Sequence, residues 1–93
     1  IARIHADLYF MGVTGVHAQA GLSTADMEEA AVKRALMAAA GDTVVMASSE
    51  KLGAASPYVI APLAAAATVL VAPDAPKGLL APLRKAGAVL VVA

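Results

Sequence analysis

The sequence contains no cysteine and only two histidines. The lack of cysteine excludes disulfide bonds and thiolate metal sites, and two histidines are too few for a histidine-based zinc site without carboxylate help. We therefore expect neither a metal nor a cofactor. A chain without disulfides is compatible with a reducing compartment, and we expect it to be cytoplasmic.

An excess of charge of either sign is also missing. Seven basic and seven acidic residues give a formal net charge of zero, and no run of like charge occurs. A nucleic-acid-binding domain needs a basic patch that neutralises phosphates. DNA contact through these residues is therefore not expected.

Hydrophobic runs of membrane length are absent, although 60% of the residues are hydrophobic. The segment 52–73 carries no charge, but Pro57, Pro62 and Pro73 interrupt it, so an apolar helix of about 20 residues does not fit. Charged residues also interrupt the apolar start of the chain, which excludes a typical secretory signal. We expect no membrane association.

The length of 93 residues suits one small domain with a single core. The chain opens at Ile1 without an initiator methionine and continues directly into an apolar strand. We therefore expect that an upstream segment is missing and that the function is divided between the two parts.

The apolar pattern predicts alternating strands and helices. Residues 6–12 form a short apolar run ending in glycine, which predicts a central strand buried on both faces of a sheet. A helix is expected over about 25–40 and the next strand over 43–47. Strand, helix and strand in this order are typical of a right-handed parallel crossover, so the class is α/β.

Helix signals frame the predicted helix. Ser23, Thr24 and Asp26 indicate its start, and Gly41 lies just past its end as a C-cap should. Its apolar stripe comprises Val32, Ala35, Leu36 and Ala39. Further along we expect a strand over 68–72, a helix over 77–86 closed by Gly87 and a strand over 88–92, with a short strand or irregular segment over 56–60 and one helical turn over 63–67.

Three polar segments lie where predicted strands end or the helix begins. Residues 12–15 follow the first strand, residues 48–51 follow the second, and Glu28 and Glu29 lie in the first helical turn. Loops after parallel strands converge on one edge of the sheet, where ligands bind. The segments offer glycine backbone, hydroxyls, carboxylates and ammonium groups, which suit a polyhydroxylated anion.

Each of these residues also has an ordinary structural interpretation. Gly12 and Gly15 can simply form a turn with positive φ. Glu29 and Lys33 are spaced i to i+4, so a solvated ion pair stabilising the helix by about 0.3–0.5 kcal/mol is sufficient to explain them. Lys51 can equally be a solvated loop lysine.

The roles of His17 and Glu28 each have two interpretations, and the remaining polar residues do not match hydrolase or nucleotide-binding motifs. His17 is either a hydrogen-bonded loop residue or a ligand contact, and Glu28 either ends the buried helix face or points into the crevice. Ser48 and Ser49 lack a Gly-x-Ser-x-Gly elbow, and neither histidine has an evident acid partner, so a hydrolase is not expected. Nucleotide loops of the Gly-x-x-x-x-Gly-Lys-Ser/Thr and Gly-x-Gly-x-x-Gly types are absent.

Several motifs, in this order and spacing, resemble the carboxy-terminal effector-sensing domain of DeoR-family bacterial transcriptional repressors. The most specific are the Glu-x-x-Val-Lys-Arg-Ala helix and the Ser-x-Lys-x-Gly loop. The resemblance covers essentially the whole chain and rests on Asp7-Leu-Tyr-Phe-Met-Gly-Val-Thr-Gly-Val16, Gly21-Leu-Ser-Thr, the helix from Glu28 to Met37, the segment from Val44 to Gly53, Pro62-Leu63 and the terminal Ala86-Gly-Ala-Val-Leu-Val-Val-Ala.

The resemblance implies a fold similar to ribose-5-phosphate isomerase and the coenzyme A transferases, here a partial three-layer Rossmann-like parallel sheet. It also implies sensing, not turnover, of a phosphorylated sugar. In the family a winged helix-turn-helix, a first strand and a Gly/Ser/Thr-rich phosphate loop precede this domain. We expect all three to be absent from residues 1–93, which then form a partial sensing domain.

The resemblance further implies a role for each candidate residue. Gly12, Thr14 and Gly15 would line the sugar side of the pocket. Glu29 and Lys51 would lie at positions like those of the isomerase's catalytic carboxylate and a substrate-binding lysine, with Lys33 beside them. Ser48 replaces the family's usual aspartate before the Ser-x-Lys element and is counted as a ligand-binding candidate, whereas an acid common near Ala67 and Ala72 is missing.

The main hypothesis is an effector-binding domain without catalytic residues, which modulates the binding of operator DNA by a separate domain. We expect a homo-oligomer, since repressors that read two-fold operators are usually symmetric, with the segment 52–73 as a candidate interface. The alternative is a sugar-phosphate isomerase or CoA-transferase-like enzyme that uses Glu29 as general base. A third interpretation is a structural domain with a degenerate pocket.

Overall fold

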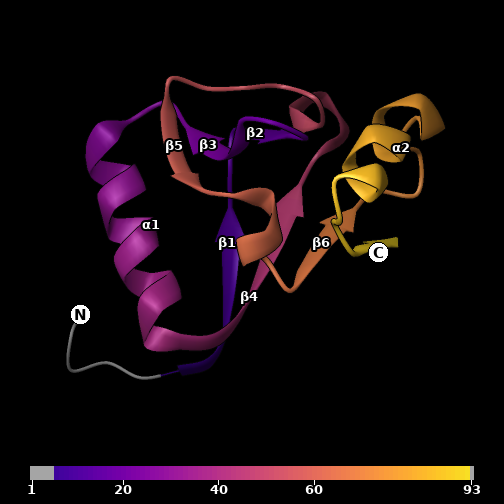
Figure 1. The fold of residues 1–93 in the computed structure, drawn as a ribbon. Coiled ribbons are helices and arrows are strands. Elements are labelled where there is room, and N and C mark those ends of the chain that lie inside the picture. Colours follow the sequence, from indigo (N-terminus) through magenta and orange to yellow (C-terminus); the bar gives the residue numbers. More distant parts are fainter. Residues whose placement is uncertain (1–5, 93) are drawn as a thin grey trace.

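A four-stranded parallel sheet forms the centre of the molecule in a computed structural model that describes residues 6–92 (Figure 1). Its strands lie in the order β1, β4, β6, β7, and each pair is parallel. The predicted α/β class with a partial Rossmann-like sheet is confirmed. The strand bounds are Ala6–Gly12 for β1, Ala40–Ala47 for β4, Thr68–Val71 for β6 and Leu90–Val92 for β7.

The connections between these strands carry the other elements. A three-stranded antiparallel sheet in the order β2, β3, β5 and helix α1 pack together, and α1 also packs against β1 and β4. Within the residues described, no helix has the length and apolar character needed to cross a membrane. The bounds are Gly15–His17 for β2, Gly21–Thr24 for β3, Met27–Ala39 for α1, Ser49–Lys51 for η1, Tyr58–Ala61 for β5, Leu63–Ala65 for η2 and Lys77–Lys85 for α2.

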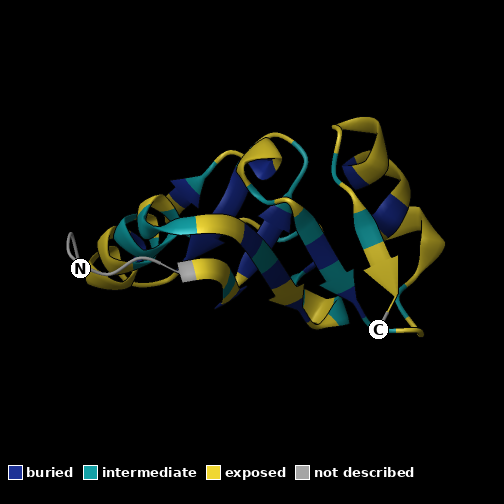
Figure 2. Cartoon of the chain, turned by 90° about the horizontal axis from the view of Figure 1, so that it is seen from below, coloured by how far each residue is buried: buried dark blue, intermediate teal, exposed yellow. Residues whose placement is uncertain are grey.

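One face of the parallel sheet is buried and the other is open. The buried face belongs to a core that includes residues of α1, η2, α2 and the small sheet, and Figure 2 shows the buried positions gathered in the middle of the molecule. The opposite face exposes Leu8, Phe10, Met46 and Val91 by 46%, 53%, 44% and 43%. The residues described therefore provide the sheet and one covering layer. The buried face comprises Met11, Thr43, Val45, Val69 and Val71.

The prediction that β1 would be a central strand buried on both faces was wrong for the described part of the chain. Among residues 6–92, β1 pairs only with β4 and is therefore an edge strand. Met11 is completely buried, but its neighbour Phe10 points to the open face and is 53% exposed. A run of apolar residues does not distinguish an edge strand from a central one, because pairing is decided by distant segments.

The start of α1 differs from the prediction in detail. Only Asp26 caps the helix, because its carboxylate accepts the backbone N–H groups of Glu28 and Glu29. Ser23 and Thr24 are instead buried residues of β3. Polar side chains in a short buried strand resemble a helix start when only local sequence is considered.

The buried face of α1 and the role of Gly41 as its C-cap were also predicted wrongly. Ala30 is buried and Met37 packs on the core, whereas Val32, in the predicted stripe, is 48% exposed. Alanines occur on every side of this helix, so apolar spacing alone specifies its orientation weakly. The helix ends at Ala39 and Gly41 belongs to β4, where a Cβ atom would lie only 2.9 Å from Asp7 O. Gly41 thus permits close approach of two strands and does not cap the helix.

The later elements follow the prediction closely. The expected strand over 68–72 is β6, the expected helix over 77–86 is α2 and the expected strand over 88–92 is β7. Gly87 follows α2 with φ of +99°, as a glycine closing a helix should. The two less regular segments become β5 and the single turn η2.

Candidate functional site

The polar segments that follow β1 and β4 lie at the same edge of the sheet. Gly12, at the end of β1, pairs in register with Met46, which directly precedes the end of β4. The end of β6 lies beside them, because Ala47 pairs with Val71. Residues 12–15, 48–51 and 72–74 therefore leave the sheet at one carboxyl edge, where ligands of open parallel sheets bind.

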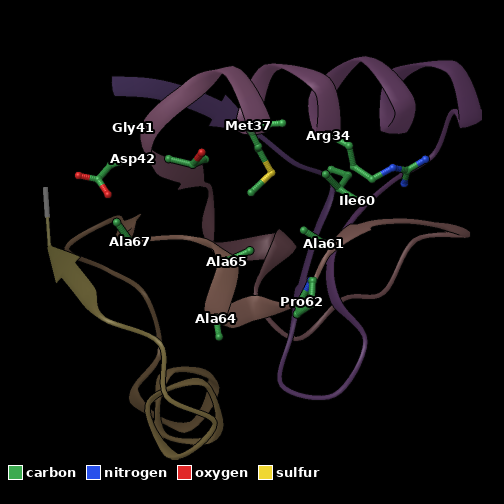
Figure 3. A pocket seen from close by; sticks show the side chains of 12 residues that line it. Arg34, Met37, Gly41, Asp42, Ile60, Ala61, Pro62, Ala64, Ala65 and Ala67 are labelled. Carbon is green, nitrogen blue, oxygen red and sulfur yellow. The ribbon is translucent and has the colours of Figure 1, made fainter. Parts of the chain in front are cut away.

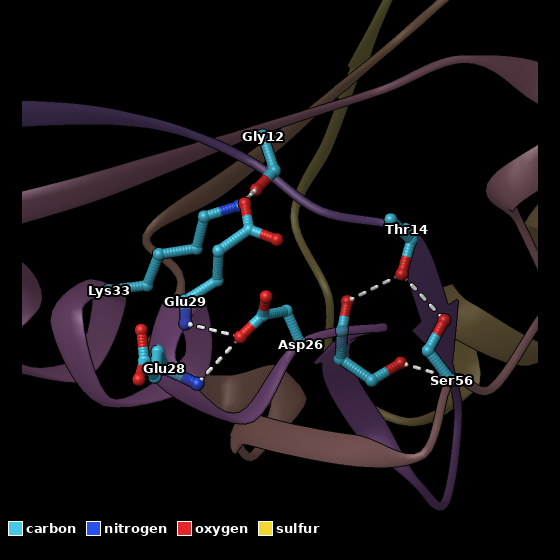
Figure 4. Close-up of polar contacts among 8 residues, drawn as sticks. Gly12, Thr14, Asp26, Glu28, Glu29, Lys33 and Ser56 are labelled. Atoms are coloured by element: carbon cyan, nitrogen blue, oxygen red, sulfur yellow. Dashed lines mark hydrogen bonds and ion pairs between the residues drawn. The ribbon is translucent and has the colours of Figure 1, made fainter.

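Gly12, Glu29 and Lys33 lie together at this edge (Figure 4). The Lys33 ammonium donates to the Gly12 carbonyl over 2.6 Å and lies 3.8 Å from a carboxylate oxygen of Glu29. The Lys33 side chain is 19% exposed and that of Glu29 is 57% exposed. The pair is thus more than a solvated helix pair, because Lys33 also joins α1 to the end of β1.

A cavity of about 350 Å³ adjoins this group and is lined by residues at the start of α1 and along it, together with one residue of β1. Three carboxylates and one ammonium line it, so its charged side chains sum to −2. The Asp26 carboxylate already accepts two backbone N–H groups, at 2.8 and 3.3 Å. Burial raises the pKa of Tyr9, so its hydroxyl stays neutral near pH 7. The lining residues are Tyr9, Asp26, Glu28, Glu29, Val32, Lys33 and Leu36.

Thr14 belongs to a neighbouring group of hydroxyls that includes two serines not predicted as site residues. Its Oγ1 lies 2.5 Å from Ser56 Oγ and 3.4 Å from the Ser23 carbonyl oxygen. The Ser56 N–H donates to Ser23 Oγ over 2.9 Å. Ser56 comes from the irregular segment before β5, and no local pattern pairs it with Thr14 because 42 residues separate them.

Gly15 is buried and has a packing role. A Cβ atom at this position would lie 2.5 Å from Ser23 Oγ and 2.6 Å from the Ala54 carbonyl oxygen. Its φ is not positive, so the need for glycine comes from close packing and not from a left-handed turn. Gly12 differs, since nothing lies within 4 Å of a Cβ atom there.

Ser48 directly precedes the single turn η1, and Lys51 is the last residue of that turn. The Ser48 hydroxyl donates to Glu50 Oε1 over 2.7 Å, and this bond, with a backbone N–H of Glu50, holds the pKa of Glu50 below its usual value. Lys51 is partly buried. The turn is anchored to β2, because the Gly53 N–H donates to the Val16 carbonyl over 2.7 Å.

A further carboxylate reaches this edge from the loop after β6. Asp74 Oδ1 accepts the Ser49 hydroxyl over 3.3 Å and so joins the loops that follow β4 and β6. Asp74 was not predicted as a site residue, although its place just after an expected strand was a signal for it in the sequence. A cavity of about 360 Å³ lies beside these loops, lined by Met46, Ala47, Ser48, Leu70, Val71, Ala72 and Pro73.

His17 is a hydrogen-bonded loop residue. Its Nδ1 accepts the backbone N–H groups of Gln19 and Ala20, both at 3.1 Å. These bonds close the turn between β2 and β3 and leave Nδ1 occupied. Of the alternatives left open for His17, the structural one therefore explains its contacts.

A hollow larger than the two cavities at the carboxyl edge lies at the opposite end of the sheet (Figure 3). Its volume is about 620 Å³, and residues at the start of β4 and before β6 line it. Alanine contributes much of the lining, and the guanidinium of Arg34 donates to the Val59 carbonyl over 2.7 Å. Size alone would favour this hollow, but the convergent hydroxyls, carboxylates and ammonium groups favour the carboxyl edge.

These features define an α/β domain whose polar loops gather at the carboxyl edge of a parallel sheet. The family described as the DeoR C terminal sensor domain matches residues 1–72. The chain therefore belongs to this family and is an effector-binding domain of a regulator. Helix α2 and strand β7 lie beyond the matched residues. No curated protein shows a significant match to the chain.

Proposed function

We propose that the effector is a phosphorylated sugar and that its binding modulates operator binding by a separate winged helix-turn-helix domain. The observation that supports this most is the cluster at the carboxyl edge, where Lys33 joins Gly12 and Glu29 next to the hydroxyl of Thr14. Carboxylates and hydroxyls accept the many hydroxyl protons of a sugar. The proposal also places the protein in the cytoplasm with its DNA.

The charges favour a division of the ligand between two places. Around Glu29 the carboxylates outnumber the ammonium group. The resulting negative charge repels a phosphate, whereas the carboxylates suit sugar hydroxyls. Lys51, beyond β4 at the same edge, is the candidate for the phosphate together with the upstream phosphate loop expected from the family. In this arrangement Gly12, Thr14, Glu29 and Lys33 hold the sugar.

A sensor changes the behaviour of its regulator only through differential affinity. The phosphosugar must bind more tightly to one arrangement of the protein than to another, and the difference in free energy sets the shift in DNA binding. The tie between Lys33 and Gly12 links α1 to the end of β1, so a ligand that contacts Lys33 acts on both elements.

The alternative enzyme would use Glu29 as a general base. The Glu29 side chain is 57% exposed and has Lys33 as its ionic partner. Proton abstraction next to a carbonyl is favoured in sites from which water is excluded. The exposure of Glu29 therefore favours sensing over turnover.

Titration of the full-length protein with pentose and hexose phosphates tests the proposal. We expect ligand-dependent operator affinity without product formation, and Lys51→Ala should weaken binding of the sugar phosphate by about 1.5–3 kcal/mol, the scale of a charged hydrogen bond. Lys77→Ala, at the exposed start of α2, is the matched control. Product formation would favour the enzyme, and no binding by any sugar phosphate would favour a degenerate pocket.

We also propose that the regulator is a homo-oligomer that uses the alanine-rich segment 52–73. Leu63 is 5% exposed and belongs to the core, so Leu63→Asp would damage the fold itself. Ala65 is exposed and suits the test. Ala65→Asp should lower the mass measured by sedimentation, with the exposed Ala81→Asp on α2 as control. An unchanged mass would remove this interface.

A further inference from the structure

We propose that Thr14 and Ser56 form a corner of the effector crevice that accepts a ligand hydroxyl and disfavours phosphate. This inference rests on the proposed function, because it concerns the same phosphosugar site. It assigns Ser56 as a positioning residue for Thr14 and as a second acceptor. The pair thereby determines which end of the ligand lies at the end of β1.

Backbone contacts hold both side chains in place. Ser23 is completely buried in β3, its carbonyl accepts the Thr14 N–H over 3.0 Å, and its hydroxyl accepts the Ser56 N–H over 2.9 Å. Three residues before Ser56, the Gly53 N–H donates to the Val16 carbonyl and holds this segment against β2. Thr14 and Ser56 are therefore both bonded to the same buried serine, while Thr14 remains exposed and Ser56 partly exposed.

The direction of the hydrogen bonds follows from counting protons. A hydroxyl has one proton and can accept two bonds, whereas the Ser23 carbonyl can only accept. The contact of Thr14 Oγ1 with that carbonyl, at 3.4 Å, uses the Thr14 proton. The 2.5 Å contact between the two hydroxyls is then a bond only if Ser56 donates. Both hydroxyl protons are then engaged by protein atoms, that of Ser56 by Thr14 and that of Thr14 by the Ser23 carbonyl.

The pair consequently presents only acceptors to a ligand. Thr14 keeps one free lone pair and Ser56 keeps two, as follows from one proton and two acceptor sites per hydroxyl. Phosphate oxygens are themselves mostly acceptors near neutral pH and find no donor here. A sugar hydroxyl can donate to this corner, and the carboxylates of Glu28 and Glu29, which line the cavity beside α1, have the same preference.

Calorimetry on the full-length protein tests the assignment, with ribose 5-phosphate, glucose 6-phosphate and inorganic phosphate as probes. Ser56→Ala should weaken the sugar phosphate that binds by about 3- to 10-fold, the effect of one neutral hydrogen bond, and leave inorganic phosphate unchanged. Thr14→Val should act likewise, while Ser56→Thr and Thr14→Ser should restore affinity. Thr68→Val, a hydroxyl on β6 outside this group, is the control.

The outcomes separate the inference from the proposed function. Sugar-phosphate binding that is unaffected by Ser56→Ala, or an equal loss for the sugar phosphate and inorganic phosphate, would overturn the role of this corner alone. Absence of binding by both sugar phosphates would overturn the proposed function and this inference with it. Melting curves of each variant identify a loss of fold. If Ser56→Ala or Thr14→Val loses its fold, the affinities of Ser56→Thr and Thr14→Ser, which keep the hydroxyl, are compared with that of the wild type instead.

Discussion

Replacing Gly15 and Gly12 separately by alanine would show which glycine of the Gly-Val-Thr-Gly turn is required for packing. Neither residue has a positive φ, so an added methyl group meets only steric resistance. At Gly15 it would lie 2.5 Å from Ser23 Oγ and 2.6 Å from Ala54 O. At Gly12 nothing lies within 4 Å.

The two substitutions are expected to change the free energy of unfolding differently, with a loss at Gly15 and no loss at Gly12. Overpacking costs about 1–3 kcal/mol, and displacement of Ser23 Oγ weakens its bond from the Ser56 N–H, worth about 1 kcal/mol. Restriction of the unfolded chain returns about 0.4–1 kcal/mol for any Gly→Ala change. Gly15→Ala should therefore destabilise the protein by about 1–3 kcal/mol, whereas Gly12→Ala should be neutral or stabilise it by up to about 1 kcal/mol.

Urea unfolding followed by circular dichroism measures both variants against the wild type. We expect the midpoint to fall for Gly15→Ala and to stay or rise for Gly12→Ala, with unchanged slopes. Equal shifts for the two variants would refute the reasoning, because a Cβ atom meets close neighbours at Gly15 and none at Gly12. A neutral Gly15→Ala would show that the chain at Ala54 moves aside at little cost.

Three further predictions concern α1, β1 and the turn after β4. Asp26→Ala should destabilise the protein by about 0.5–2 kcal/mol through loss of the helix cap, and Asp26→Asn should preserve most of it in the same unfolding assay. Met11→Ala should cost about 2–5 kcal/mol by opening a cavity, while Phe10→Ala, on the open face, should cost less than about 1.5 kcal/mol; similar losses would contradict the assignment of the two faces. Ser48→Ala should raise the pKa of Glu50 toward its ordinary value in an NMR titration. Because the folded-state pKa is lowered, the stabilisation is present above the unfolded-state pKa and is lost as the pH falls through the folded-state pKa, so wild type and variant should converge in acid.

The order of elements was largely predictable because it depends on local sequence. Each signal involves only a few neighbouring residues. Examples are the apolar runs of strand length, Asp26 at the start of the long helical segment and Gly87 after the last helix. The hairpin of β2 and β3 was missed, since its short buried strands contain Ser23 and Thr24, which locally resemble a helix start. The orientation of α1 was also missed, because alanines surround the helix and only its packing on β5 and β4 selects Ala30 as the buried side.

The sequence by itself determined that residues 12–15 and 48–51 share one edge, because parallel strands place their carboxyl ends together. Only the tertiary structure decided what each residue does there. It joined Lys33 to Gly12, gave Gly15 a packing role and brought Ser56 to Thr14 across 42 residues. Contacts of this kind depend on distances of a few tenths of an ångström between distant segments, and local periodicity contains no information about them.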